Sequence, residues 1–330
     1  MSDTAEAVVL VTARSFGGAR PELRAELEAA VGEVLWNELG RPLEPAELTG
    51  ALDSVDGVIA GLDRFDAGVI ESAPRLRVIA RHGVGTDRID LVAAARHGVV
   101  VTNTPGANSE AVAELAIGLM LALARSIPLA DRKVRAGEYG ALPGVELGGR
   151  TVGLLGIGRA GSGVARRAGA LGCRVVAFDP GVDDDEIRRR GAVPLPRDEV
   201  VATSDFLSLH LPASEDTRDT VDAAFLAHMK RGAYLINTAR GELVVERDLL
   251  AALADGRLAG AALDALRREP PPADDPLLAC DDVILTPHSG ADTEEARAAM
   301  GRMALDDLLA ALRGEPPRHP VAAPAEGRGG

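Results

Sequence analysis

The stretch Thr151-Val152-Gly153-Leu154-Leu155-Gly156-Ile157-Gly158-Arg159-Ala160-Gly161 decides the fold class. A mostly apolar run, typical of a buried strand, leads directly into a Gly-x-Gly-x-x-Gly turn that opens a helix. In such a turn Gly156 permits the tight bend, Gly158 lets the backbone approach a pyrophosphate, and Gly161 lets helix and strand pack closely. The helix N-terminus, where Arg159 and Ala160 stand, supplies amide donors and partial positive charge.

The next segment completes this pattern. A second apolar strand, Arg174–Phe178, ends at Asp179, eighteen residues after Gly161. A carboxylate there accepts hydrogen bonds from the adenosine ribose hydroxyls and repels a 2′-phosphate. Neither neighbour of Asp179 is an arginine that could hold such a phosphate. We therefore predict a site for NAD rather than NADP, the alternative being a structural turn without a ligand.

Short apolar runs alternate with helical patterns on both sides of this turn, and the length of 330 residues suggests about two domains. Such alternation predicts an α/β protein with parallel sheets that are covered by helices on both faces. The predicted strands are Val8–Val11, Gly57–Ala60, Leu76–Ala80, Val99–Val101, Val152–Leu155, Arg174–Phe178, Phe206–Leu209, Tyr234–Ile236, Gly260–Leu263 and Val283–Leu285.

Helix-forming residues fill the segments between and after these series. The stretch Ser109–Ala136 predicts two helices separated at Pro128. Its apolar part, Ala111–Ala124, is expected to be a buried core helix, or alternatively a domain connector that also forms a dimer surface. The segment Asp292–Leu312 predicts a final amphipathic helix, and Pro316–Gly330 is expected to be a loose tail.

Composition excludes several classes of protein. Basic residues number 36 and acidic residues 50, so the net charge of −14 argues against a nucleic-acid or anionic-membrane partner. Cys173 and Cys280 have no metal-ligand spacing, and we expect no metal site and two free thiols in a reducing cytoplasm. The N-terminus lacks the pattern of a signal peptide. Ala111–Ala124 is interrupted by Glu114 and is too short for a bilayer, which needs about 20 residues.

Three segments after the dinucleotide turn carry candidate catalytic side chains. Arg240 follows the strand that ends at Ile236, where ligands bind in parallel sheets, and its forked guanidinium suits a carboxylate. Asp264 and Glu269 follow the next strand, and His288 follows the one after that. A histidine with a carboxylate to orient it can move a proton near neutral pH. Taken singly, each residue could equally be structural.

Together these segments resemble the D-isomer-specific 2-hydroxyacid dehydrogenases, most closely the D-3-phosphoglycerate-dehydrogenase-like branch. The resemblance covers residues from about 55 to 300, in the family's order. Besides the dinucleotide turn and the three catalytic segments, the matching stretches are Ala80-Arg81-His82-Gly83-Val84-Gly85-Thr86-Asp87, Val101-Thr102-Asn103-Thr104-Pro105-Gly106-Ala107-Asn108-Ser109 and Ser208-Leu209-His210-Leu211-Pro212.

The resemblance implies a Rossmann NAD-binding domain, residues 106–290, inserted into a discontinuous flavodoxin-like substrate domain, residues 1–105 and 291–330. It also implies a homodimer. Arg240 would bind the substrate carboxylate and carbonyl, His288 would be the acid/base, and Glu269 would hold it. The substrate contacts would be Arg81, Gly83, Val84, Asn108 and Arg240. The cofactor contacts would be Gly156, Gly158, Arg159, Ala160, Gly161, Asp179, Thr238, Ala239, Arg240, Asp264, His288 and Gly290.

The resemblance implies reversible hydride transfer between NAD(H) and a small 2-hydroxy or 2-oxo acid in the cytoplasm. Gly61 and Leu62 stand where phosphoglycerate enzymes tend to have a phosphate-binding arginine, whereas Arg81 retains another, and Arg64 is a candidate replacement. The sequence leaves the acid open between 3-phosphoglycerate, a related phospho- or phosphono-acid, glyoxylate and hydroxypyruvate. The alternatives are a glyoxylate or hydroxypyruvate reductase and a non-catalytic NAD-responsive binding protein of the same fold.

Overall fold

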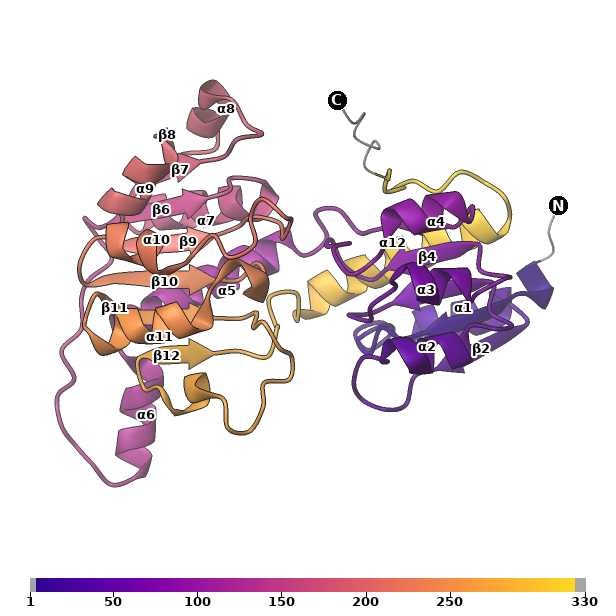
Figure 1. Cartoon of the computed structure of the whole chain (residues 1–330), viewed down its shortest axis with the longest axis horizontal. Coiled ribbons are helices and arrows are strands. Elements are labelled where there is room, and N and C mark those ends of the chain that lie inside the picture. Colours follow the sequence, from indigo (N-terminus) through magenta and orange to yellow (C-terminus); the bar gives the residue numbers. More distant parts are fainter. Residues whose placement is uncertain (1–3, 324–330) are drawn as a thin grey trace. The chain divides into compact units, whose positions relative to one another are not determined.

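The computed structural model describes residues 4–323, whose backbone forms two compact units. The first unit combines residues up to Asn108 with residues from Ala291 onward, and the second is Ser109–Gly290. Each has its own parallel sheet, as the alternation of strands and helices predicted (Figure 1). The α/β fold class is therefore confirmed.

The first unit contains a five-stranded parallel sheet in the order β2-β1-β3-β4-β5, which is the flavodoxin-like order. Helices α1 and α12 share a core with one face of this sheet, and α2, α3 and α4 share a core with the other. The strands are β1 (Val8–Val11), β2 (Glu33–Trp36), β3 (Gly57–Ala60), β4 (Val78–Arg81) and β5 (Val100–Thr102). The helices are η1 (Thr4–Glu6), α1 (Glu22–Ala30), α2 (Pro45–Ala51), α3 (Ala67–Glu71), α4 (Leu91–Arg96) and α12 (Glu294–Leu312).

The second unit contains a seven-stranded parallel sheet in the order β12-β11-β10-β9-β6-β7-β8, a Rossmann order extended by one strand. Its strands are β6 (Thr151–Leu155), β7 (Arg174–Phe178), β8 (Val193–Pro194), β9 (Phe206–Leu209), β10 (Ala233–Asn237), β11 (Leu258–Leu263) and β12 (Val283–Leu285). Its helices are α5 (Ser109–Ala124), α6 (Ile127–Arg135), α7 (Arg159–Ala170), α8 (Asp184–Arg189), α9 (Arg197–Thr203), α10 (Ala223–His228), η2 (Gly241–Leu243), α11 (Glu246–Ala254) and η3 (Pro276–Ala279).

The elements that the sequence did not reveal are mostly at the sheet edges. Strand β2 is a half-exposed edge strand, and β8 has only two residues, so neither carries a continuous buried apolar run. Helices α2, α8 and α9 have six or seven residues each, too few to show a clear helical period. Their ends depend on local caps, such as the Asp183 carboxylate that accepts the amide hydrogen of Glu186 in α8.

The expectation of a loose tail from Pro316 onward is wrong for its first part. The Val321 amide donates to Val101, and the Asn103 amide donates to His319, so the chain pairs along strand β5. The buried carboxylate of Asp307 holds this segment, because it accepts hydrogen bonds from the Arg318 amide and from Nδ1 of His319, at 2.7 and 2.8 Å. Residues 324–330 of the predicted tail lie outside the described residues.

Helix α5 is the buried core helix that the sequence predicted, since half of its sixteen residues are buried. It packs on α7 and on strands β10 and β11. Among residues 4–323 no single helix is long and apolar enough to cross a membrane. Helices α5 and α6 reach that length and composition only together, and they are bent by 59° at the break between them.

His82, in the loop after β4, makes the first unit sensitive to acid. Its side chain is buried edge-on against the Phe16 ring, with ring centroids 6.2 Å apart, and Nε2 has no hydrogen-bond partner among residues 4–323. Burial, assisted by the positive charge of Arg81, lowers the pKa of His82 to about 4. The fold therefore keeps this imidazole neutral at pH values where the unfolded chain, with an ordinary histidine pKa, binds a proton.

We predict that the first unit loses stability as the pH falls from 7.5 to 5. The stabilising contribution is complete above the unfolded pKa and declines toward the folded pKa, by one to two kcal/mol at pH 5 (~1.4 kcal/mol per unit of pKa difference). Urea unfolding followed by the fluorescence of Trp36, the single tryptophan, reports on this unit. The His82→Gln variant should show a smaller difference between the two pH values, and an unchanged difference would contradict the prediction.

Candidate active site

The dinucleotide turn joins β6 to α7, and its glycines are required by close backbone contacts. Gly156 has φ +92°, and a Cβ there would lie 2.6 Å from the His210 carbonyl oxygen. A Cβ on Gly161 would lie 2.4 Å from the Gly156 oxygen, whereas one on Gly158 would meet nothing within 4 Å. The first and third glycines therefore serve packing, and the second faces open space that a phosphate group can enter.

The donors and the carboxylate around this turn suit a dinucleotide. The amides of Arg159 and Ala160 begin α7 and have no acceptor among residues 4–323. Asp179, at the end of β7, accepts the Ile157 amide of the turn at 2.8 Å and the Gly181 amide at 2.9 Å. These bonds fix the carboxylate beside the turn. The hydroxyl oxygen of Thr238, after β10, is buried without a partner among the described residues, which leaves it available to a ligand.

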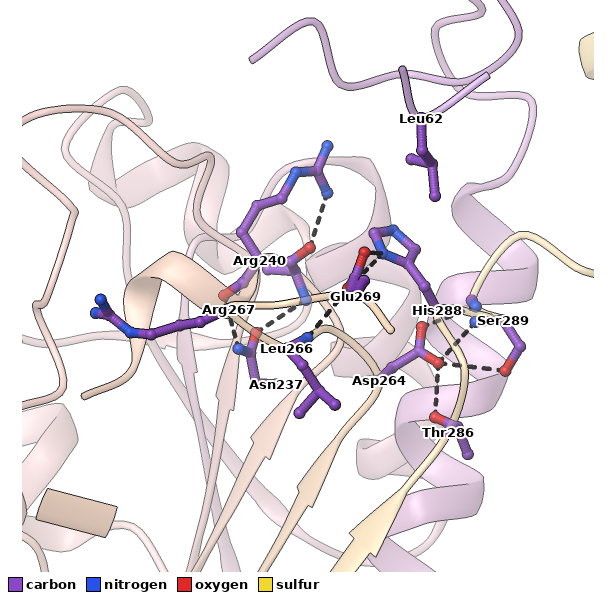
Figure 2. A network of polar contacts seen from close by, with 12 residues as sticks. Leu62, Asn237, Arg240, Asp264, Leu266, Arg267, Glu269, Thr286, His288 and Ser289 are labelled. Carbon is purple, nitrogen blue, oxygen red and sulfur yellow. Dashed lines mark hydrogen bonds and ion pairs between the residues drawn. The ribbon is translucent and has the colours of Figure 1, made fainter. Parts of the chain in front are cut away.

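His288 and Glu269 form a direct pair in the second unit. Nδ1 of His288 lies 3.0 and 3.1 Å from the two carboxylate oxygens of Glu269, and both side chains are largely buried (Figure 2). Oε1 of Glu269 also accepts the Leu266 amide at 3.1 Å. The other ring nitrogen of His288, Nε2, has no partner among residues 4–323. This is the arrangement that a general acid/base needs, with one nitrogen held and the other available.

Asp264 holds the turn that carries His288. One carboxylate oxygen accepts bonds from the Thr286 hydroxyl, the Ser289 amide and the Ser289 hydroxyl, at 2.6, 2.8 and 3.2 Å (Figure 2). The other oxygen accepts the Gly290 amide at 2.8 Å, and the carbonyl of Asp264 accepts the His288 amide at 2.8 Å. His288 has φ +54°, an uncommon conformation for a residue other than glycine. The buried Asp264 therefore fixes this conformation through the neighbours of His288.

Arg240 lies on the turn that follows β10. The side chain of Asn237 spans this turn, because Nδ2 donates to the Arg240 carbonyl at 2.7 Å and Oδ1 accepts the Ala239 amide at 3.0 Å. A Cβ on Gly241 would overlap the backbone of Leu266, so this turn packs directly on the loop that leads to Glu269. Strand register aligns Asn237 with Leu263 and Leu263 with Leu285. Arg240, Glu269 and His288 therefore leave the same edge of one sheet.

The predicted substrate contacts other than Arg240 lie in the first unit. Arg81 ends β4, and its guanidinium donates to the carbonyls of Gly85, Ala60 and His82. The amide of Gly83 already donates to the Arg81 carbonyl at 2.9 Å, whereas those of Val84 and Gly85 have no acceptor among residues 4–323. The predicted amides were those of Gly83 and Val84, whereas the amides without an acceptor are those of Val84 and Gly85, one residue later. The side-chain amide of Asn108 has no partner in the described part of the chain either.

Several residues of this site had no predicted role. Asn237 and Thr286 flank predicted residues, and their position at the ends of strands was the available signal. Ser289 lies in the stretch from His288 to Gly290 that the resemblance places beside the nicotinamide. His210 lies at the end of β9, under Gly156, and its Nε2 is 3.0 Å from the Ser208 hydroxyl. Burial lowers the pKa of His210 to about 4, so that a neutral ring supports the dinucleotide turn.

Comparison with known proteins agrees with this geometry. Residues 117–290, slightly more than half of the chain, match the family described as D-isomer specific 2-hydroxyacid dehydrogenase, NAD binding domain. The chain belongs to this family. As a D-isomer specific 2-hydroxyacid dehydrogenase it is an oxidoreductase with NAD as its cofactor, and the dinucleotide turn, Asp179 and Thr238 fit that cofactor.

Individual relatives carry different names. Glyoxylate reductase from Korarchaeum cryptofilum is 39% identical over 86% of this chain and 87% of that protein. D-3-phosphoglycerate dehydrogenase from Methanocaldococcus jannaschii is 41% identical over 86% of this chain, which spans only 54% of the relative. The structure of TT0316 protein from Thermus thermophilus is 38% identical and superimposes with a TM-score of 0.84, covering 96% of this chain and 100% of the other.

We predict that Asp179 sets the preference of this dehydrogenase for NADH over NADPH. In Asp179→Ser the repulsion of a 2′-phosphate is lost, and the discrimination between the two cofactors should fall by at least about tenfold, or 1.4 kcal/mol. Steady-state KM values for both cofactors measure it. The exposed Asp184 of α8, changed to Ser, is the matched control. A variant Asp179→Ser that still rejects NADPH as strongly as the parent would refute this role.

The turn around Asp264 gives a second prediction. In Asp264→Asn an NH2 group replaces one oxygen that faces buried donors, so kcat should fall at least about tenfold and the free energy of unfolding by about 1–3 kcal/mol. Thr286→Val removes a single donor and should have a smaller effect on both. Initial rates and urea titrations provide the two measurements. An unchanged kcat in Asp264→Asn would show that the turn does not depend on this carboxylate.

Proposed function

We propose that this protein reversibly transfers hydride between NAD(H) and a small D-2-hydroxy or 2-oxo acid. The observation that supports it most is the His288–Glu269 pair, 3.0 Å apart, beside the Arg240 turn on the same sheet as the dinucleotide turn. A proton donor and a carboxylate-binding guanidinium at one strand edge are what reduction of a 2-oxo acid requires.

Each residue of the trio has a distinct role in this proposal. Nδ1 of His288 is held by Glu269, so Nε2 delivers the proton to the oxygen of the 2-oxo group and removes it from the hydroxyl in the reverse direction. Both carboxylate oxygens of Glu269 hold the ring through Nδ1 in either direction. The forked guanidinium of Arg240 binds the carboxylate and stabilises the charge that develops on the carbonyl oxygen. When bound, the nicotinamide supplies or accepts the hydride.

In this proposal the two units have different roles, one toward the cofactor and one toward the substrate. The second unit would be the NAD domain, with Thr238, Ala239, Asp264, His288 and Gly290 near the nicotinamide. The first unit would be the substrate domain, where unpartnered amides follow β4 and Asn108 presents its side-chain amide. For the acid itself there are two candidates: a phospho- or phosphono-acid such as 3-phosphoglycerate, and glyoxylate or hydroxypyruvate. The similarity to dehydrogenases and reductases with both names supports each.

An NADH-consumption panel of 2-oxo acids, with and without a terminal phosphate, tests the proposal. In that assay His288→Ala should lose about 10²–10⁴-fold in kcat, the usual contribution of a general acid, with little change in NADH affinity. Glu269→Gln should lower kcat about tenfold or more, because an amide cannot hold Nδ1 of His288 through two equivalent oxygens.

Two results would contradict these assignments. Retention of more than a tenth of the parent activity in His288→Ala would remove His288 from the acid/base role. Absence of NADH consumption by the parent protein with every acid of the panel, despite tight NADH binding, would favour the non-catalytic NAD-responsive protein instead.

We also propose that the chain forms a homodimer through the segment that includes the end of α5 and α6. Four large apolar side chains are exposed within it: Leu121, Ile127, Val134 and Tyr139, at 36, 53, 55 and 96%. Exposed large apolar side chains gathered in one segment are typical of a contact with another protein. The acidic charge and two free cysteines support a cytoplasmic location for the dimer.

The double variant Ile127→Glu/Val134→Glu is predicted to be monomeric, because charges would be buried in the contact. Light scattering after size-exclusion chromatography measures the mass. Leu39→Glu, a change at an equally exposed leucine of the first unit, should leave the dimer intact. A parent protein that elutes as a monomer at micromolar concentration would exclude the proposed dimer.

A further inference from the structure

The loop after β4 is held by the side chain of Arg81. Its Nε donates to the Gly85 carbonyl at 3.1 Å, and its Nη1 donates to the carbonyls of Ala60, at 3.4 Å, and His82. Gly83 has φ +149°, and a Cβ there would lie 2.8–2.9 Å from three guanidinium atoms of Arg81. The planar group therefore fills the space over Gly83 and bridges both ends of the loop.

The carbonyl groups of this loop are all engaged. Arg81 binds those of His82 and Gly85, the Thr104 amide donates to Gly83 at 3.0 Å, and the Asn103 side chain donates to Val84 at 2.7 Å. Four successive carbonyl oxygens thus have donors, whereas the consecutive amides of Val84 and Gly85 have no acceptor among residues 4–323. These two consecutive amides, called the nest below, are therefore available to an anion.

Among the charged and titratable groups discussed around this loop, Arg81 supplies the positive charge. His82 is buried and neutral at physiological pH, and it packs against Phe16. Arg297 of α12 also faces His82, but its guanidinium is paired with the Asp292 carboxylate at 3.1 Å. The buried carboxylate of Asp63, in the neighbouring loop, accepts the amides of Leu43 and Gly61 and so adds negative charge there. Arg81 therefore both ties the loop together and carries positive charge within it.

We propose that Arg81 is a positioning residue for the nest formed by the Val84 and Gly85 amides, which takes the substrate carboxylate, and that it is not the contact to a terminal phosphate. This inference rests on the proposed function for the identity of the anion. Its donors serve three backbone carbonyls, so the affinity gained through Arg81 is shared by every 2-oxo acid, whatever its tail. A lysine has one nitrogen and cannot bridge Ala60, His82 and Gly85 in this way.

The first experiment is amide hydrogen exchange, measured by mass spectrometry on the parent protein, Arg81→Lys and Arg81→Gln. Loss of the bridge should accelerate exchange of the hydrogen-bonded amides of His82, Gly83 and Thr104 at least about tenfold in both variants, with the peptides of the second unit unchanged. Equal protection of these three amides in all three proteins would overturn the proposal. This measurement requires no substrate, so it remains decisive even if the proposed activity is absent.

The second experiment compares KM for glyoxylate, hydroxypyruvate and its 3-phosphate. In Arg81→Lys and Arg81→Gln we expect KM to rise by the same factor, about tenfold or more, for all three acids, with a smaller change in kcat. A rise confined to the phosphorylated acid, or restoration of parent values by lysine, would overturn the proposal. Arg20→Gln is the control, since Arg20 is an exposed arginine of the first unit that pairs with Glu22; it should leave KM for all three acids unchanged.

Discussion

The catalytic half of this protein depends on one buried carboxylate. Asp264 is 2% exposed and accepts hydrogen bonds from the turn after β12 on both oxygens. Burial of a carboxylate costs free energy unless each oxygen accepts hydrogen bonds. A turn in which several amides point the same way likewise needs an acceptor. Asp264 meets both requirements at once. The left-handed conformation of His288 follows from that arrangement.

Glu269 provides a second restraint on His288. Asp264 fixes the backbone of the histidine turn, and Glu269 fixes the ring itself through Nδ1. Both carboxylates lie in the segment that follows β11, and they hold different parts of His288, Asp264 its backbone turn and Glu269 its ring. Because Gly241 packs on the backbone of Leu266, the Arg240 turn is attached to the same structure. The three side chains of the trio thus share one rigid support.

In the first unit a charged side chain also fixes a loop by hydrogen bonds, but this side chain is a cation. There the loop after β4 presents amides, and the guanidinium of Arg81 takes the carbonyl groups that would otherwise face an anion. Arginine suits this purpose because its donors are arranged in a fixed plane. Three short backbone segments lie at the carboxyl ends of parallel strands: the dinucleotide turn, the turn that carries His288, and the nest. Ligands generally bind at this end of such sheets.

The sequence by itself determined the α/β class, the dinucleotide turn, the place of Asp179 beside that turn and the candidate trio, because each depends on residues that are close in the chain or directly follow an apolar strand. It did not reveal edge strands β2 and β8 or the short helices, which lack a continuous buried face. Only the tertiary structure decided that residues 319–321 pair along β5, that both oxygens of Asp264 are engaged, and that Arg81 binds its own loop. Those outcomes depend on hydrogen bonds between backbone groups or between residues far apart in sequence, and no residue pattern encodes which carbonyl a given donor will meet.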